Sequence, residues 1–465
     1  MERIIDAEHL YSNIKELLEK QNDIEEVRKQ LGIIHLRILQ RDVMKRTKER
    51  DCTKELVVYN KIAFYLLTKL TNFEYDEAVY FEGMEIAAFC FEVLFKTKMY
   101  KPQEEVEYGF FSSICYALAE NQANSIIMAN KVLDNYEEYC ITGRYIYIYI
   151  LFLARKYKKL SRMVVVDDTV IKEIVRFSKS MIYRNEKKNY LNGLEDVLFQ
   201  LRNEESEDYY MFRLIYLVAK RMDICSIRNL LIDNSELVDY IDVLTQKEIR
   251  NVFELWQSQK FLFDAMEQIK ETENIFFLSL PTSAGKTLVS ELILYKFLSY
   301  KRGIAIYIVP TIALTNEIEN SFIRRFRKVG INVIKELEYD DESSIAKPAI
   351  LILTPEKLDL LVRKQPEVLE ELECIVFDEF HKISDGQRGW LEETLIAWFV
   401  FHMNTYNYKI VMMSAIVDGL KDSLSNIKST IYDNKWTPSK KCMACFICLK
   451  IIKKSMVIML KKMMK

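Results

Sequence analysis

The spacing of hydrophobic residues along the chain changes near its middle. In the first half, apolar residues recur every three or four positions, most clearly in residues 4–31, 80–95 and 207–222. This spacing is typical of amphipathic helices. No repeat of fixed period accompanies it, although stacked helical hairpins would give a similar pattern. We therefore predict a helical N-terminal domain over residues 1–245.

From about residue 274 the pattern alternates between short β-branched runs and helical segments. The runs are "NIFFLSL", "IAIYIVP", "AILILTP", "CIVFDEF", "YKIVMMSAI" and a weaker "INVIKEL". Continuous apolar strands between helices predict a parallel sheet that is covered on both faces. The distribution of proline changes as well, since six of the seven prolines lie at or after Pro281. We predict an α/β domain over residues 246–432, so the fold class is α + α/β.

Bulk composition narrows the possible partners without identifying them. The formal net charge is −2, which excludes a nucleic-acid binder that works by overall positive charge but leaves binding through a local groove or backbone amides open. Nine cysteines are scattered without a secreted pattern, and Met1 begins no signal peptide, so we expect a cytoplasmic protein with free thiols. The longest apolar run, residues 145–154, is far below the roughly 20 residues that span a bilayer. A buried helix or strand, and no membrane partner, are expected there.

The first candidate for chemistry is Gly285-Lys286-Thr287, which follows a predicted strand and begins a helix. This is the context of a phosphate-binding loop, since backbone N–H groups at a helix N-terminus face the phosphates. Lys286 would reach the β- and γ-phosphates, and the Thr287 hydroxyl would ligate Mg²⁺. The general pattern has a glycine where this chain has Leu280. A fortuitous Gly-Lys-Thr in a loop is the alternative.

The second candidate is Asp378-Glu379, which ends another predicted strand about 90 residues later. Asp378 would hold Mg²⁺, usually through water, and Glu379 would orient or deprotonate the attacking water. His381 could transmit changes at the nucleotide to the rest of the protein. An Asp-Glu pair alone is most often a solvated turn, but together with a phosphate loop it predicts nucleotide hydrolysis.

These strings occur in an order that resembles the DEAD/DEAH-box helicases of superfamily two. The matching strings are "LPTSAGKT", "VPTIALTNEI", "TPEKLD", "DEFH" and "MSAI". "DEFHKISDGQRGWLEETL" is similar to the superkiller-like branch, through Arg388, Gly389 and Glu393. The resemblance covers roughly residues 255–416 and implies that residues 246–432 form a RecA-like, P-loop ATP-binding helicase lobe.

The resemblance also implies roles for individual residues. Gln259, in a string similar to the Q motif, would hydrogen-bond adenine and favour ATP over GTP. Ser414 and Ala415 would couple hydrolysis to strand movement, although the family's usual Thr after them is Ile416 here. The residues implied to bind ATP and Mg²⁺ in the loop are Thr282, Ser283, Ala284, Gly285, Lys286 and Thr287. Those implied to contact one nucleic-acid strand are Pro310, Thr311, Ala313, Thr354 and Pro355.

A basic cluster follows the second of these strings. It consists of Arg324, Arg325, Arg327 and Lys328. The cluster could contact phosphate, but we expect a solvated helix face.

The end of the chain departs from the family's pattern. Such helicases close two RecA-like lobes around ATP, with arginine fingers from the second lobe, but only about 50 residues follow Ser414 and no Arg follows Arg388. We expect residues 433–465 to be an irregular basic tail, truncated or out of frame. The spacing of Cys442, Cys445 and Cys448 permits a zinc or iron–sulfur site, but we expect no site, because no nearby fourth ligand is available.

Two functions remain open at this point. In the first, the chain is the first motor lobe of an ATP-dependent nucleic-acid helicase or translocase, incomplete without a second lobe and acting on DNA or RNA. In the second, it is a nucleotide-binding scaffold or sensor that docks a protein partner, such as a nuclease, through its helical domain without productive turnover. A GTPase is disfavoured because there is no Asn-Lys-x-Asp string. The architecture is also similar to helicases of bacterial antiphage defence systems.

Overall fold

The computed structural model describes residues 12, 16, 53–136, 141, 145–163, 168–183, 190–231, 235–246, 252–260, 274–281, 285–299, 303–335, 346–380, 386–415 and 430–433. The chain divides into two compact units. The first, the helical unit, comprises residues 1–223 together with 439–465, and the second, the sheet unit, comprises residues 224–438. Predictions for residues 4–31, apart from residues 12 and 16, and for Cys442, Cys445 and Cys448 lie outside the described residues.

The described part of the first unit is entirely helical, as its apolar spacing predicts. Short polar residues begin several helices: the side chains of Asp76, Asn121 and Asp168 accept hydrogen bonds from backbone N–H groups of the first turns of α4, α6 and α9, which otherwise lack partners. The helices are α3 (Thr53–Asn72), α4 (Glu77–Lys96), α5 (Pro102–Leu118), α6 (Gln122–Asn135), α7 (Ile146–Leu153), α8 (Tyr157–Ser161), α9 (Thr169–Ile182), α10 (Leu191–Asn203) and α11 (Tyr209–Ile224).

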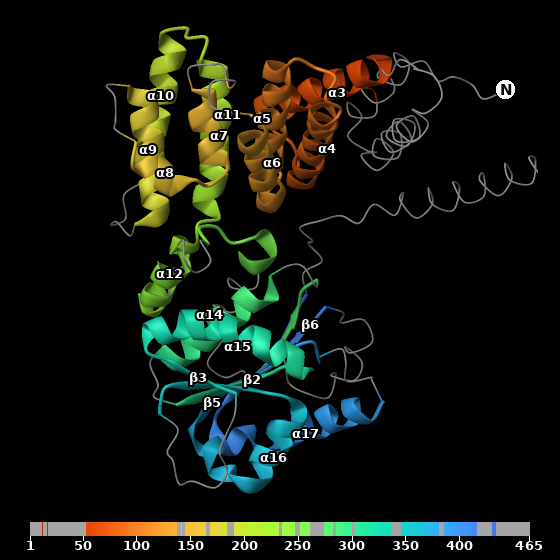
Figure 1. Ribbon diagram of the computed structural model, residues 1–465, viewed down its shortest axis with the longest axis vertical. Coiled ribbons are helices and arrows are strands. Elements are labelled where there is room, and N and C mark those ends of the chain that lie inside the picture. Colours follow the sequence, from red (N-terminus) through yellow and green to blue (C-terminus); the bar gives the residue numbers. More distant parts are fainter. Residues whose placement is uncertain are drawn as a thin grey trace, which may run out of the picture. The chain divides into compact units, whose positions relative to one another are not determined.

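Consecutive helices of this unit pack against one another, α3 on α4, α4 on α5 and α5 on α6 (Figure 1). Aromatic rings fill the interfaces. Phe91, Phe110 and Phe152 are fully buried, and Phe91 stacks on Phe111 with ring centroids 5.4 Å apart. At Gly109 a Cβ atom would lie 2.4 Å from Val132 Cγ2, so only glycine lets α5 and α6 approach this closely. The run at 145–154 forms the buried helix α7.

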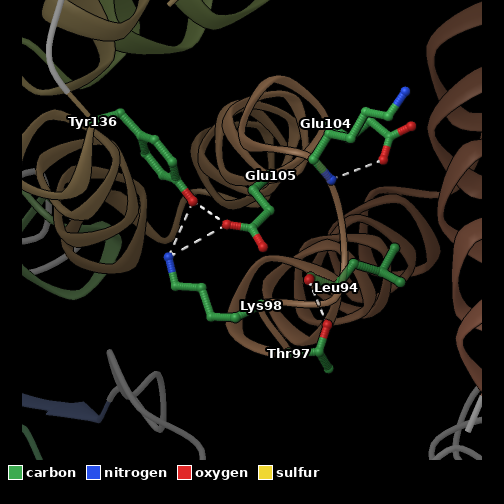
Figure 2. A network of polar contacts seen from close by, with 7 residues as sticks. Leu94, Thr97, Lys98, Glu104, Glu105 and Tyr136 are labelled. Atoms are coloured by element: carbon green, nitrogen blue, oxygen red, sulfur yellow. Dashed lines mark hydrogen bonds and ion pairs between the residues drawn. The ribbon is translucent and has the colours of Figure 1, made fainter. Parts of the chain in front are cut away.

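Polar side chains tie the ends of three of these helices together (Figure 2). Lys98, just after α4, donates to the hydroxyl of Tyr136 at 3.1 Å and lies 3.5 Å from the carboxylate of Glu105 in α5. The Tyr136 hydroxyl, at the end of α6, donates to Glu105. The Lys98 ammonium also lies 5.0 Å from the centroid of the Phe95 ring. Glu105 is therefore neutralised where it is buried, which a carboxylate requires.

The second unit is built on a seven-stranded sheet in the order β3-β4-β2-β5-β6-β1-β7, in which all recorded strand pairs are parallel. The strands are β1 (Ile275–Ser279), β2 (Ile304–Ile308), β3 (Asn332–Ile334), β4 (Ala349–Leu353), β5 (Leu372–Phe377), β6 (Lys409–Ser414) and β7 (Thr430–Asp433). The six strands expected from the sequence are confirmed, and β7 is an additional one. β1, β2 and β4 are buried along their whole length, which explains their continuous apolar runs.

Helices cover both faces of this sheet (Figure 1). One face packs against α14 (Lys286–Ser299) and α15 (Ile312–Phe326), and the other against α16 (Pro355–Lys364) and α17 (Gly386–Tyr406). Alternate residues of each strand serve the two cores: Tyr307 points to the α14 face, while Ile306 and Ile308 point to the α16 face. The fold is therefore a helical unit plus a parallel-sheet, RecA-like lobe, as predicted.

Residues 224–244 pack with the sheet unit. They form the short helices η2 (Ile227–Leu231), η3 (Ser235–Leu237) and α12 (Val238–Leu244), whose apolar side chains join the core under α14. The ring of Tyr240 stacks on those of Tyr295 and Phe326 at 4.8 and 4.9 Å. The sequence pattern had grouped this stretch with the helical N-terminal domain. The short helices η4 (Arg327–Val329) and η5 (Pro366–Glu371) complete the unit.

Two further features of the described residues bear on the sequence-based expectations. Their helices include none with both the length and the apolar character needed to cross a membrane. The cysteines among them, Cys90, Cys115, Cys225 and Cys374, are buried free thiols.

Candidate nucleotide site

The candidate residues gather at one edge of the sheet because the strands that carry them are parallel. β1 ends before Gly285, β2 before Pro310, β4 before Thr354 and β5 before Asp378. Parallel strands place all their carboxyl ends at the same edge, which is where ligands bind in open α/β sheets. The pairing continues into the loops, since the Leu280 N–H donates to the Ser414 carbonyl at 2.9 Å and the Asp378 N–H to the Ile308 carbonyl at 3.0 Å.

The turn before α14 needs a glycine for two reasons. Gly285 has φ +75°, a left-handed conformation that glycine adopts without a steric penalty. A Cβ at this position would also lie 2.2 Å from Nε2 of Gln259. Lys286 follows as the first residue of α14, where backbone N–H groups and the helix dipole favour an anion.

Gln259 connects the segment before β1 to this turn. Its amide nitrogen donates to the Gly285 carbonyl at 3.3 Å, and its amide oxygen accepts from the Trp256 N–H at 2.9 Å. The side chain is almost fully buried. Adenine recognition by Gln259 stays a prediction. These two hydrogen bonds connect the Q-like string directly to the turn before α14.

Lys286 and Glu379 meet at this edge. The Lys286 ammonium donates to Glu379 Oε1 at 2.7 Å, with the two side chains 8% and 21% exposed. Glu379 has φ +54°, a left-handed conformation that is uncommon for a residue with a side chain and is held only where the surroundings impose it. A partly exposed pair of opposite charges, one on α14 and one after β5, is thus present at this edge of the sheet.

Asp378 is held differently from its neighbour. Its Oδ2 accepts a hydrogen bond from the Tyr307 hydroxyl at 2.9 Å, and its Oδ1 accepts from the Glu379 N–H at 2.9 Å. Burial raises the pKa of Asp378, and the nearby Lys286 charge lowers it in part. Burial also raises the pKa of Tyr307 well above its ordinary value, so the hydroxyl keeps its proton. Both oxygens of Asp378 are therefore fixed by neutral donors.

The remaining predicted site residues lie in different surroundings, and some lie outside the described residues. Ser414, at the end of β6, is buried and pairs in register with Ser279 of β1. Thr287 is partly buried in the first turn of α14. The predicted site residues Thr282, Ser283, Ala284 and His381 lie outside the described residues.

The predicted strand-contacting residues lie at the N-termini of two helices. The Thr311 side chain caps α15, accepting from the Leu314 N–H at 3.3 Å, and Ala313 is exposed beside it. Thr354 and Pro355 begin α16 and are buried, as is Pro310. Any contact to a nucleic-acid backbone from these three would therefore involve main-chain atoms more than side chains.

The basic cluster is not uniform, and one expectation for it is wrong. Arg325 is buried and forms an ion pair with Glu291 of α14 at 2.8 Å, whereas Arg324, Arg327 and Lys328 are exposed. Arg325 therefore belongs neither to a solvated face nor to a phosphate contact. Its position in α15 places it on the same side as Phe322 and Phe326, which pack on the sheet.

Sequence reasoning also missed Tyr307. It lies in the continuous apolar strand "IAIYIVP", where a tyrosine reads as core. The signal that could have found it is register: Tyr307 pairs with Val376, so Asp378, two residues further on, falls on the same face of the sheet.

The candidate lysine and the acidic pair thus lie together at the carboxyl edge of a parallel sheet. Residues 263–422 match the DEAD/DEAH box helicase family. The match includes Lys286, Asp378 and Glu379. This part of the chain is therefore similar to the DEAD/DEAH-box helicases of superfamily two.

Similar proteins differ in how much of this chain they match. ATP-dependent DNA helicase Hel308 of Methanococcus vannielii is 30% identical over 180 residues, covering 37% of this chain and 23% of that protein. Hachiman protein HamB of Bacillus cereus is 26% identical over 385 residues, covering 75% of this chain and 33% of that protein. The second match is longer than the sheet unit, so it includes part of the helical unit.

The chain thus spans only about a quarter to a third of the length of these two curated relatives. Among solved structures, the DUF1998 helicase MrfA covers 43% of this chain and 32% of that chain at 22% identity, with a TM-score of 0.32.

Proposed function

We propose that this chain carries the ATP-binding motor lobe of an ATP-dependent nucleic-acid helicase or translocase. The observation that supports this most is the 2.7 Å contact between Lys286 and Glu379. It brings the residue expected to grip the phosphates within one hydrogen bond of the residue expected to activate water. Both lie at the carboxyl edge of the sheet, beside Asp378, and the family match covers all three.

In the proposed reaction the incoming phosphates replace Glu379 as the partner of Lys286. The freed Glu379 carboxylate then accepts a proton from a water molecule whose oxygen attacks the γ-phosphorus. The bond from the γ-phosphorus to the bridging oxygen breaks, which gives ADP and inorganic phosphate. Lys286 stabilises the negative charge on the transferring group. The ion pair is thus a resting contact that the nucleotide must open.

Asp378 and Thr287 are the residues proposed to hold Mg²⁺. A carboxylate and a hydroxyl are the hard oxygen donors that Mg²⁺ prefers, and the neutral donors that fix Asp378 leave its negative charge available. Among the described residues no group of three or more His, Cys, Asp or Glu side chains gathers around one point. Asp378 and Thr287 therefore fit an ion that arrives with the nucleotide phosphates and keeps several waters. Such an ion would neutralise phosphate charge.

The motor is proposed to move along a nucleic-acid strand. The N-termini of α15 and α16 lie at the same edge as the nucleotide site and present Thr311, Ala313 and the turn at Thr354. Helix N-termini bind phosphate groups through backbone N–H groups, and such contacts address the strand backbone more than its bases. Hel308 is named a DNA helicase, which favours DNA as the strand.

The test of the nucleotide site is calorimetric titration of ATP into the purified chain with Mg²⁺ present. Lys286→Ala is expected to weaken ATP binding by at least about 100-fold, because a charged hydrogen-bond partner of two phosphates is removed. Lys296→Ala, at the far end of the same helix, is the matched control and is expected to bind as wild type. Equal affinity in wild type and Lys286→Ala would overturn the proposed site.

A scaffold or sensor role without turnover is the second candidate. The HamB match extends into the helical unit, which favours a role for that unit together with the lobe, such as docking a protein partner. Phosphate release measured with and without single-stranded DNA or RNA separates the two functions. Stimulation by a strand supports the motor, and the better of the two strands identifies its substrate. Binding of ATP with no phosphate release supports the scaffold.

A further inference from the structure

The side chain of Tyr307 joins the middle of the sheet to the acidic pair. Tyr307 is 0% exposed and lies in β2, next to β5. It pairs in register with Val376, so Asp378 is on the same face of the sheet two residues further along. The tyrosine belongs to the core on that face, and its hydroxyl donates to Asp378 Oδ2 at 2.9 Å.

The ring and the hydroxyl of Tyr307 have separate functions. The ring packs edge-on against Phe322 of α15, with centroids 5.3 Å apart, and phenylalanine would fill the same space. A buried hydroxyl, however, is costly to desolvate unless it is hydrogen-bonded. The core therefore gains nothing from the hydroxyl itself. The hydroxyl adds a directed contact to one oxygen of Asp378, and it also interacts with the Ser290 hydroxyl of α14.

The contact completes a two-point hold on the Asp378 carboxylate. The other oxygen accepts from the Glu379 N–H at 2.9 Å, which fixes it to the backbone. With one point alone the carboxylate could still rotate about its last torsion, which is broad for aspartate. With both points its plane is set. Each oxygen still has a lone pair, since a carboxylate has about four acceptor sites.

We infer that Tyr307 is a positioning residue for metal-dependent nucleotide binding, acting by orienting the carboxylate of Asp378. The inference rests on the proposed function, because it assigns Asp378 to the Mg²⁺ of a nucleotide complex. Groups that orient a metal's carboxylate ligands typically contribute 10- to 100-fold to metal affinity or activity. Tyr307 does not touch the nucleotide in this assignment, so its effect appears only through the metal.

The experiment compares Tyr307→Phe with wild type by the fluorescence of a labelled ATP analogue, titrated with Mg²⁺ and separately measured in EDTA. The Mg²⁺ concentration for half-maximal tightening is expected to rise about 10-fold in Tyr307→Phe. Affinity in EDTA is expected to stay within about twofold. A general packing defect would instead weaken binding in both conditions.

Two controls make the result specific. Tyr408→Phe removes another buried hydroxyl of the same unit, one that donates to the Phe399 carbonyl at 2.6 Å, and its Mg²⁺ dependence is expected to match wild type. In an Asp378→Ala background, adding Tyr307→Phe is expected to have no further effect on the Mg²⁺ dependence. An additive effect there would show that Tyr307 acts on something other than Asp378.

The outcomes separate the two proposals. Wild type that binds the analogue with Mg²⁺ dependence, together with an unchanged Tyr307→Phe, overturns only the role of Tyr307. Wild type that binds no analogue, or binds it without any Mg²⁺ dependence, overturns the proposed site and this inference with it. A 10-fold shift in Tyr307→Phe that is absent in Tyr408→Phe supports both.

Discussion

Lys286 and Glu379 form an ion pair at the edge of the sheet, and Arg325 and Glu291 form another beneath the same helix, α14. The distances are alike, 2.7 and 2.8 Å. The surroundings differ, since Glu379 is 21% exposed whereas Glu291 is 0% exposed. Glu291 also accepts a hydrogen bond from Tyr240 of α12 at 2.8 Å, and Arg325 donates to Ser321.

This difference separates a contact that can open from one that cannot. An ion pair near water loses little when an incoming anion replaces one partner. A fully buried pair is different, because breaking it leaves an uncompensated charge in the core. We expect the edge pair to control activity and the inner pair to control folding, although Glu291 lies only five residues after Lys286 in the same helix.

The largest expected effect is on turnover, in Glu379→Gln. The amide cannot accept a proton from water, so the rate of phosphate release is expected to fall about 10²- to 10⁴-fold. ATP binding is expected to be at least as tight as in wild type, because Lys286 no longer has a carboxylate partner to leave. Phosphate release and calorimetry on the same samples check both parts. A variant that hydrolyses normally would show that Glu379 is only a structural partner of Lys286.

The next largest effect is on folding, in Arg325→Met. Leaving the Glu291 charge without this partner in the core is expected to lower the free energy of unfolding of the sheet unit by about 3–5 kcal/mol. All four tryptophans of the chain, Trp256, Trp390, Trp398 and Trp436, lie in the sheet unit. Tryptophan fluorescence during urea unfolding therefore reports on that unit.

Two matched variants sharpen this result. Arg324→Met changes the exposed neighbour in the same helix and is expected to shift the free energy of unfolding by less than about 0.5 kcal/mol. Combining Arg325→Met with Glu291→Leu removes both charges and is expected to recover most of the loss. If the double variant is no better than Arg325→Met, the cost lies in lost packing and not in an unpaired charge.

The smallest expected effect belongs to a partly buried carboxylate of the helical unit. Burial alone would raise the pKa of Glu92, but hydrogen bonds from Lys96 and Tyr116 outweigh it and lower the pKa overall. A carboxyl whose pKa is lower in the folded state stabilises that state above its unfolded pKa, and the contribution disappears as the pH falls through the folded value.

Glu92→Gln is therefore expected to lower the stability of α4 and α5 by about 1 kcal/mol at pH 7. The difference from wild type is expected to shrink as the pH falls below the ordinary glutamate pKa of about 4.3. It is expected to vanish once the pH is below the lowered pKa of the folded state. Amide hydrogen exchange of peptides from these two helices, measured at several pH values, gives the local free energies. A difference that persists unchanged at acid pH would mean that the substitution acts through packing instead of charge.

The sequence was sufficient for the parts of this protein that local pattern encodes. Six strands, several helices of the first unit and the strand-end positions of Lys286 and Asp378 followed from apolar spacing and from the letters after each apolar run. Parallel connections then place those letters at one edge, whatever the details of packing. The strand β7 was missed because it has only two apolar residues, Ile431 and Tyr432, between polar ones, and so forms no apolar run.

Only the tertiary structure determines the contacts between segments that are distant in the chain. A tyrosine in an apolar strand and an arginine in a basic cluster look like a core residue and a surface residue. Whether Tyr307 reaches Asp378, and whether Arg325 turns inward to Glu291, depends on strand register and on which face of α15 packs on the sheet. The same holds for residues 224–244, whose helical pattern does not say which core they join. Local spacing fixes the type of an element and its apolar face, but the partner of that face is chosen by the packing of the whole unit.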